Sequence, residues 1–208
     1  MMNNSWNKTI YRLWSPIYDL FFNKGYFLKA RKSVFTMDNF TEGQKVLFVG
    51  VGTGAELELI DHTKLQITAI DYSPEMLSKA KSKFVHSSIH FLEMDAQQLS
   101  FENNSFDVVV GSLIISVVPH PNKAIEEMIR VLKPNGKMII FDKFAKKDGK
   151  LSLLKKIIRP IIARFGTDIG INFEQLISRY ERSIYVVEDT ELMLNGMFRK
   201  IILTKKDY

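Results

Sequence analysis

A glycine-rich loop and two aspartates are the residues whose types and spacing could do chemistry. They are the loop 50–54 (GVGTG), Asp71 and Asp95, and each follows a separate run of apolar residues. If these runs are parallel strands, ligands bind beyond their carboxyl ends, where glycines let the backbone approach a ligand closely. A carboxylate at Asp71 would accept hydrogen bonds from both ribose hydroxyls of an adenosine, and one at Asp95 from the exocyclic amine. The series therefore predicts an adenosine-binding site.

Two other interpretations of the same loop remain open at this point. Residues 50–55 (GVGTGA) also fit the dinucleotide pattern G-x-G-x-x-A, which places a pyrophosphate at the N-terminus of the next helix. The third glycine, Gly54, and the lack of a Tyr-x-x-x-Lys pair count against a nicotinamide cofactor. A tight turn with two capping aspartates would explain each aspartate singly, but explains the full series less well.

The elements that must position these residues are an alternation of apolar runs and amphipathic stretches. Strands are predicted at 45–49, 67–70, 89–92, 106–112 and 137–141, and helices at 55–65, 73–84 and 122–132, with a turn at 133–136. Further along, helical stretches at 143–180 precede two strands, near 184–187 and 198–203, which could pair as a hairpin through Asn195-Gly196. Continuously apolar strands alternating with helices predict an α/β fold whose parallel sheet is covered on both faces.

Five segments between residues 43 and 142 resemble, in order, the motifs of the class I S-adenosylmethionine-dependent methyltransferases. They are VLFVGVGTG, AIDYSPEML, MDAQQLSF, FDVVVGSLIISVV and RVLKPNGKMII. The resemblance implies a Rossmann-like, mostly parallel seven-stranded sheet of order 3-2-1-4-5-7-6 with an N-terminal helical cap. The length favours a single domain, so we expect one methyltransferase domain over 1–208. It would consist of the cap (1–42), a cofactor-binding core (43–142), a basic helical insertion on the substrate side (143–182) and C-terminal strands (183–208).

The same resemblance implies S-adenosyl-L-methionine as cofactor, with S-adenosyl-L-homocysteine as product, and assigns residues to it. The glycines Gly50, Gly52 and Gly54 would face the methionine part, Asp71 the ribose, and Asp95 and Ala96 the adenine. The other cofactor-binding residues assigned are Thr53, Tyr72, Met76 and Ser112. Phe48 stands where the family usually has an acid that helps hold the methionyl ammonium. We expect Glu56, Asp19 or a backbone carbonyl to take over that role, and cofactor binding to survive.

The acceptor side is marked by the segment 112–116 (SLIIS), which follows the fourth predicted strand. It lacks the Asn/Asp-Pro-Pro-Tyr/Phe element of enzymes that methylate the amines of nucleic-acid bases, which argues against that class. Its apolar character suits an acceptor with an apolar part. A sulfonium is already activated, so alignment and desolvation can supply much of the rate without acid–base groups.

Two further segments resemble particular branches of the family. Residues 12–19 (RLWSPIYD) resemble the opening of bacterial phospholipid (phosphatidylethanolamine) N-methyltransferases and of ubiquinone/menaquinone methyltransferases, and 117–121 (VVPHP) resembles the phospholipid branch. The resemblance places Tyr18 at the reaction centre, and His120 is the candidate general base, with a plain turn histidine as the alternative. The predicted substrate pocket consists of Tyr11, Trp14, Tyr18, Ile115 and Ser116, although core packing would explain the aromatic residues equally well.

The net charge of +6 is concentrated in one segment. Residues 143–164 carry a net +7 and the rest of the chain −1, which argues against nucleic acid as a partner, although an RNA methyltransferase stays open on charge alone. Apolar residues recur there at helical spacing, so the segment predicts either contact with an anionic membrane surface or a cover over the active site. The sequence does not specify an oligomeric state.

The remaining expectations concern metals, location and acceptor. The 208 residues include no cysteine, and His86 and His90 would not share a helical face, so we expect no metal site. The N-terminus lacks the apolar core of a signal peptide, which predicts a cytoplasmic protein, with peripheral contact at the inner face of the membrane left open. The expected acceptor is a small or lipid-like molecule, either a phosphatidylethanolamine-type amine or a quinone-like ring. The alternatives are a soluble natural-product or metabolite methyltransferase and a non-catalytic S-adenosylmethionine-binding module.

Overall fold

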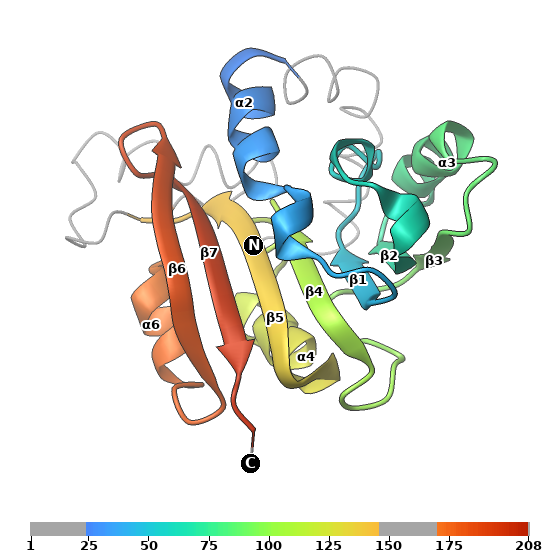
Figure 1. Cartoon of the computed structure of the whole chain (residues 1–208). Coiled ribbons are helices and arrows are strands. Elements are labelled where there is room, and N and C mark those ends of the chain that lie inside the picture. Colours follow the sequence, from blue (N-terminus) through green and yellow to red (C-terminus); the bar gives the residue numbers. More distant parts are fainter. Residues whose placement is uncertain (1–23, 146–169, 208) are drawn as a thin grey trace.

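Seven strands form one sheet in the order β3-β2-β1-β4-β5-β7-β6, in a computed structural model that describes residues 24–145 and 170–207 (Figure 1). The strands are β1 (Lys45–Val49), β2 (Gln66–Asp71), β3 (His90–Glu93), β4 (Phe106–Ser112), β5 (Leu132–Lys143), β6 (Ile184–Met193) and β7 (Phe198–Lys205). The first five are parallel to one another, whereas β7 runs antiparallel to both β5 and β6. The predicted strand order is confirmed.

Helices cover both faces of this sheet, as predicted (Figure 1). The described helices are α2 (Gly25–Val34), α3 (Pro74–Lys83), α4 (Pro121–Val131) and α6 (Phe173–Ser178), with short 3₁₀ turns η1 (Met37–Asn39), η2 (Leu57–Leu59) and η3 (His62–Lys64). One core cluster joins the sheet to α4 and α6 through Met128 and Leu176. The other joins it to α2 and α3 through Val34 and Leu77. Side chains from both faces of the inner strands β1, β4, β5 and β7 are therefore buried, which explains their apolar runs. Most residues of the edge strands β3 and β6 are exposed or half-buried.

The predicted start of α3 and the predicted turn of the β6–β7 hairpin are both confirmed, and each depends on local backbone preferences. Ser73 is the N-cap of α3: its hydroxyl accepts a hydrogen bond from the backbone N–H of Met76 at 3.2 Å, and Pro74 follows it. The β6–β7 hairpin turns at Asn195 and Gly196, whose φ angles are 54° and 78°. Positive φ at two successive positions is what an Asn-Gly pair tolerates best.

The helix predicted over 55–65 is wrong. The chain forms the two 3₁₀ turns η2 and η3 there, separated by Ile60 in an extended conformation. Leu57 and Ile60 are both buried, and this spacing of three residues suits a 3₁₀ turn. The hydroxyl of Thr63 donates to Asp61 at 2.6 Å, a local bond of the kind that competes with helix formation.

The turn predicted at 133–136 lies within the bounds of β5, where it interrupts the regular pairing of β5 with β4. The register with β4 changes from Phe106 opposite Leu132 to Val108 opposite Lys137. Asn135, inside the interruption, has φ of 60°. The regular ladder therefore resumes at Lys137, where the sequence predicts the strand to begin.

Candidate functional site

The glycine loop follows β1 and has the backbone conformation that only glycine adopts easily. Gly50, Gly52 and Gly54 have φ of 71°, 56° and 79°. The N–H groups of Gly50 and Val51 both donate to the carbonyl of Ile70 at 2.9 Å, so β2 holds the loop. A Cβ on Gly50 would lie 2.7 Å from the Ile114 side chain, whereas one on Gly52 would meet no atom of the described residues within 4 Å. The backbone at Gly52 therefore borders open space, where a ligand can approach it closely.

Asp71, the last residue of β2, lies against this loop. One carboxylate oxygen accepts the N–H of Gly52 at 2.8 Å, and the other accepts the N–H of Ser73 at 2.8 Å. Burial raises the pKa of Asp71 to about 6, although these backbone hydrogen bonds favour the ionised form. A backbone hydrogen bond from Tyr72 also favours the ionised form. A carboxylate has about four acceptor positions, so that of Asp71 can still accept from a ligand hydroxyl. The structure thus brings Gly52 and Asp71 into direct contact.

Asp95 follows β3, at the same edge of the sheet as Asp71. Its carboxylate accepts from the backbone N–H of Gln97 at 2.9 Å and from the Gln97 side-chain amide at 2.9 and 3.2 Å. Ala96 is buried. Gln97 was not among the predicted site residues, although it lies inside the third motif. Its contact to Asp95 depends on a side-chain conformation that a motif does not specify.

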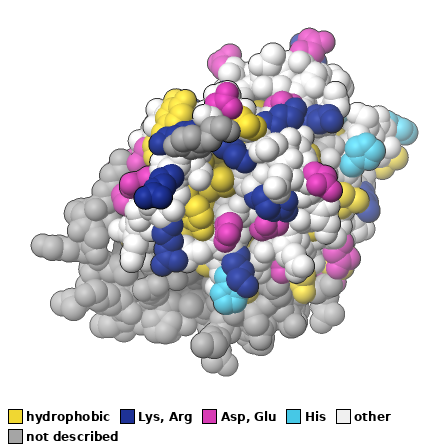
Figure 2. Space-filling model, turned by 90° about the horizontal axis from the view of Figure 1, so that it is seen from below, with side chains coloured by type: hydrophobic (Ala, Val, Ile, Leu, Met, Phe, Trp, Pro, Cys, Tyr) yellow, Lys and Arg dark blue, Asp and Glu magenta, His cyan; other side chains and the backbone are white. Residues whose placement is uncertain are grey.

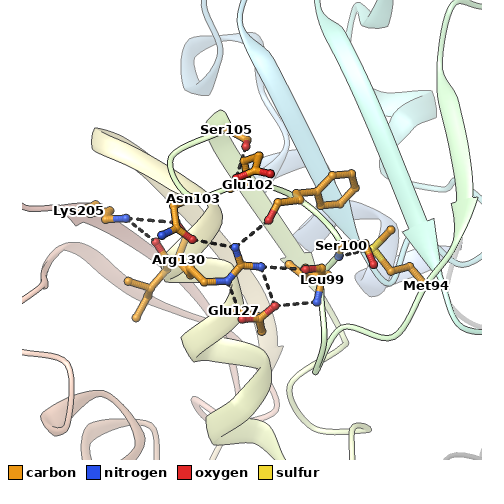
Figure 3. Close-up of polar contacts among 11 residues, drawn as sticks. Met94, Leu99, Ser100, Glu102, Asn103, Ser105, Glu127, Arg130 and Lys205 are labelled. Atoms are coloured by element: carbon orange, nitrogen blue, oxygen red, sulfur yellow. Dashed lines mark hydrogen bonds and ion pairs between the residues drawn. The ribbon is translucent and has the colours of Figure 1, made fainter.

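A polar network holds the segment that carries Asp95 against α4 (Figure 3). The Glu127 carboxylate accepts the N–H of Leu99 at 2.7 Å, and Arg130 donates to the carbonyls of Leu99 at 2.8 Å and Phe101 at 2.7 Å. The Arg130 guanidinium beside Glu127 lowers the pKa of that carboxyl, which favours its ionised form. The loop between β3 and β4 is therefore fixed at its middle as well as at its ends.

Ser112, at the end of β4, belongs to a buried polar cluster that reaches the glycine loop. Its hydroxyl donates to Glu56 at 2.6 Å, and Arg31 of α2 lies 3.1 Å from the same carboxylate oxygen. All three residues are buried, with Glu56 only 4% exposed. Phe48 of β1 lies opposite Val110 of β4. Since alternate strand residues share a face, Ser112 lies on the face of Phe48, two residues nearer the loop.

Of the two side chains expected to replace the missing acid at Phe48, Glu56 lies within the described residues, and its role stays a prediction. Phe48 itself is a core residue, 2% exposed. The carboxylate of Glu56 reaches the end of β4, at the level of Gly50, because Val49 pairs with Gly111. Glu56 and Ser112 were both predicted site residues, but their contact was not predicted, and neither was the role of Arg31, since these contacts span 25 residues to Arg31 and 56 to Ser112.

The segment after β4 is held by a carboxylate that the sequence analysis missed. Asp142, near the end of β5, accepts the N–H groups of Ile115 at 2.7 Å and Ser116 at 3.1 Å. Asp142, Ile115 and Ser116 are fully buried, and burial raises the pKa of Asp142. His120, exposed before α4, donates its backbone N–H to the Gln97 side chain at 2.9 Å. The placement of Ile115 and Ser116 in a substrate pocket stays a prediction.

The remaining predicted site residues are placed as follows. Thr53 and Met76 are buried, whereas Tyr72 is 39% exposed. Several predicted residues lie outside the described part of the chain: Tyr11, Trp14, Tyr18, Asp19 and residues 146–164 of the basic segment. Lys143 lies inside them, and burial lowers its pKa.

The described ranges contain neither a metal-binding group nor a membrane-spanning helix. No group of three His, Asp or Glu side chains within 24–145 and 170–207 could hold a metal ion. No helix in that part of the chain is long and apolar enough to cross a bilayer. On the face seen from below, basic and acidic side chains are interspersed among the coloured residues (Figure 2).

The matching family model and the similar curated proteins are all described as methyltransferases. The family model described as "Methyltransferase domain" matches residues 47–140. The phosphatidylethanolamine N-methyltransferase of Cereibacter sphaeroides is 34% identical over 194 residues, which are 90% of this chain and 92% of that protein. A demethylmenaquinone methyltransferase of Renibacterium salmoninarum is 41% identical over 98 residues, which are 47% of this chain and only 40% of the relative.

Solved structures share the fold at low sequence identity. A chain of the complex between the Haloferax volcanii Trm112 methyltransferase activator and a putative methyltransferase has a TM-score of 0.77 and 15% identity, covering 97% of this chain and 98% of that one. The N-methyltransferase NodS of Bradyrhizobium japonicum, solved with S-adenosyl-L-homocysteine, has a TM-score of 0.67 and 15% identity, with coverage of 89% and 90%. At this identity the likeness shows the fold alone.

Proposed function

Because this chain belongs to the class I S-adenosylmethionine-dependent methyltransferases, we propose that it methylates a lipid-like acceptor, with a phosphatidylethanolamine-type amine as the leading candidate. The choice of acceptor rests on how much of this chain is similar to each relative. The phosphatidylethanolamine N-methyltransferase matches over 90% of this chain, well beyond the core, whereas the quinone-type relative from Renibacterium matches over 47%. A quinone-like ring is therefore the second candidate.

The described residues fit S-adenosylmethionine, the cofactor of this family. Gly52 borders open space, and Asp71 has lone pairs for ribose hydroxyls. Asp95 can accept from the adenine amine, and Glu56 presents a buried carboxylate for the methionyl ammonium. The further contacts proposed are those of Gly50, Thr53, Gly54, Tyr72, Met76, Ala96 and Ser112. The cofactor supplies a methyl group on a sulfonium that is activated for direct transfer.

The chain's own residues would mainly orient and desolvate the acceptor. Asp142 holds the backbone of Ile115 and Ser116, which keeps the segment after β4 in one conformation. An ammonium acceptor must lose a proton before its nitrogen can take a methyl group. We propose that His120, which lies after β4, accepts this proton as a general base. Tyr18 remains the proposed residue of the reaction centre.

Transfer of labelled methyl groups tests the proposal. The full chain and labelled S-adenosylmethionine are incubated in parallel with phosphatidylethanolamine vesicles, a quinone extract, a small-metabolite pool and total RNA. We expect label in the phospholipid. Label confined to metabolites supports the soluble alternative instead, and binding of S-adenosylhomocysteine without label in any pool supports a non-catalytic module.

Glu56→Gln is expected to weaken S-adenosylhomocysteine binding roughly tenfold, because a charged hydrogen bond is worth about 1.5–3 kcal/mol. Binding of methylthioadenosine, which lacks the amino-acid part, should not change. Calorimetric titration with both ligands measures this. Glu58→Gln is the matched control, since Glu58 is exposed and pairs with Lys83 at 3.4 Å. Equal losses for the two ligands would show that Glu56 only supports the loop.

The basic segment 143–164 is expected to bring the protein to anionic membranes at the cytoplasmic face. Neutralising Lys155, Lys156 and Arg159 to glutamine should weaken flotation with anionic vesicles, by roughly 1 kcal/mol per charge, and wild-type flotation should fall with salt. The control replaces the exposed residues Lys32, Lys81 and Lys123 in the same way. Salt-independent flotation, or equal losses in both triple variants, contradicts this role.

A further inference from the structure

The turn that follows β4 contains a residue in a strained backbone conformation, Leu113. Its φ is 53°, in the left-handed region, although it is a buried leucine. This conformation is unfavourable for any residue with a side chain, because it brings Cβ too close to the following carbonyl oxygen. Such strain persists only where the surrounding structure holds it, and it clusters at functional sites. Leu113 directly follows Ser112, the last residue of β4, so the strain lies at the carboxyl edge of the parallel strands.

The neighbouring strand β5 holds this turn. β4 and β5 run side by side in parallel, and both end at this edge (Figure 1). The N–H of Leu113 donates to the carbonyl of Phe141 at 2.8 Å. One carboxylate oxygen of Asp142 accepts the N–H groups of Ile115 at 2.7 Å and Ser116 at 3.1 Å. Asp142 is fully buried, so a bond lost there is not readily replaced by one to water.

The side chain that this turn brings to the glycine loop is that of Ile114. It fills the space that a side chain on Gly50 would take, since a Cβ there would lie 2.7 Å from Cδ1 and 3.1 Å from Cβ of Ile114. Ile114 is half-buried, whereas Ile115 and Ser116 are fully buried. A shift of the turn would therefore change the contact between Ile114 and the first glycine of the loop.

The glycine loop is held separately, by β2. The N–H of Gly50 donates to the carbonyl of Ile70 at 2.9 Å, and the N–H of Gly52 donates to Asp71 at 2.8 Å. The loop is thus fixed to one strand and the turn to another. The two meet where Ile114 lies against Gly50.

We propose that Asp142 is a positioning residue for methyl transfer, which sets the acceptor side of the site against the glycine loop through Ile114. This inference rests on the proposed function, in which the cofactor lies along the loop and the acceptor lies after β4. During transfer, the lone pair of the acceptor bonds to the methyl carbon while the carbon–sulfur bond breaks and leaves its electron pair on sulfur. Acceptor, carbon and sulfur must be in line for this step, and a misplacement of about 1 Å can cost roughly 100-fold in rate.

The test measures methyl transfer to phosphatidylethanolamine vesicles and S-adenosylhomocysteine affinity, both with the full chain. Asp142→Asn replaces one acceptor oxygen by an NH2 group and removes the charge. We expect kcat and kcat/KM to fall together, by roughly 10- to 100-fold. S-adenosylhomocysteine affinity should stay at the wild-type value, because β2 still holds the loop. Ile114→Ala, which removes no polar group, should show the same pattern. Hydrogen exchange at the amides of Ile115 and Ser116 should become faster in Asp142→Asn.

Combining Asp142→Asn with Ile114→Ala tests whether Asp142 acts through Ile114. The double variant should lose no more transfer rate than the more damaging single variant. Asp107→Asn is the control for a carboxylate that accepts a backbone N–H, here from Lys45 at 2.8 Å. Because Asp107 lies near the start of β4, its replacement should lower the unfolding temperature and leave both kcat and the amide exchange of the turn unchanged.

Thermal unfolding confirms that each variant is folded. The inference is overturned if folded Asp142→Asn keeps the wild-type kcat or amide exchange, or if the two single losses multiply in the double variant. It is also overturned if S-adenosylhomocysteine affinity falls as far as kcat, since general support of the site would then explain both losses. Should Asp142→Asn not fold, unchanged transfer by Ile114→Ala overturns the inference by itself.

Failure of the proposed function gives a different result, in the wild type. Label that the wild type transfers only to another pool overturns phosphatidylethanolamine as the acceptor, and the same variants are then measured on that pool. A wild type that binds S-adenosylhomocysteine but methylates nothing overturns the proposed function, and this inference with it.

Discussion

Asp71→Ala is expected to reduce S-adenosylhomocysteine affinity by roughly 100-fold or more. Two charged hydrogen bonds to the ribose, each worth about 1.5–3 kcal/mol, are lost together. The same change removes the acceptors of the Gly52 and Ser73 N–H groups, so the glycine loop also loses its anchor. Asp71→Asn keeps one acceptor oxygen and should lose less. Isothermal titration on folded protein measures both variants.

Asp107→Asn is the matched control for this prediction. Asp107 also accepts a backbone N–H, from Lys45 at 2.8 Å, and it pairs with Lys133 at 2.7 Å. It lies near the start of β4, at the opposite edge of the sheet from the glycine loop. Its replacement should lower the unfolding temperature without changing the affinity. If the affinity falls in Asp107→Asn as much as in Asp71→Asn, Asp71 has no direct role in binding.

The raised pKa of Asp71 adds a pH dependence with a definite sign. Ribose hydroxyls need the ionised carboxylate, so affinity should be highest at neutral pH and fall as the pH drops through about 6. Asp71→Asn should flatten this profile. The stability effect has the opposite direction. Because the folded pKa lies above the ordinary 3.8, the contribution of Asp71 to the free energy of unfolding is fully present below that value and is lost as the pH rises through about 6.

Gly50→Ala is expected to lose stability, whereas Gly52→Ala is expected to lose mainly S-adenosylhomocysteine affinity. At Gly50 a Cβ would lie 2.7 Å from the Ile114 side chain, and φ is 71°. A left-handed residue costs about 1–2 kcal/mol and overpacking about a further 1–3 kcal/mol, so the variant should lose roughly 2–5 kcal/mol of stability. Urea unfolding followed by circular dichroism measures this loss.

Gly52→Ala separates binding from stability. Within 24–145 and 170–207, no atom lies within 4 Å of its added Cβ, so only the φ of 56° is unfavourable there. The stability loss should therefore stay near about 1–2 kcal/mol. The new methyl group enters the space beside the loop, so S-adenosylhomocysteine affinity should fall more than tenfold. Normal affinity in folded Gly52→Ala protein would place the cofactor elsewhere.

The strands and the elements at their ends could be predicted from the sequence because their signals are local. An apolar run ends at Asp71, and Ser73-Pro74 begins the next helix through its own hydrogen bond to Met76. The glycine loop needs positive φ angles that few other residues adopt. The motif order adds the topology by resemblance. The wrong helix at 55–65 shows where local signals conflict, since its apolar residues fit a helix but its backbone forms 3₁₀ turns.

The partners of the site residues were decided by the tertiary structure. Glu56 reaches Ser112 and Arg31, Asp142 reaches the backbone of Ile115, and Gln97 reaches His120, over separations of 23 residues or more. Hydrophobic patterning specifies which face of an element is buried, but not which side chain of another element it meets. The sequence by itself thus determined the fold, the cofactor and the residues at the strand ends. Only the packing of loops over the carboxyl edge of the sheet decided which polar groups hold those residues in place.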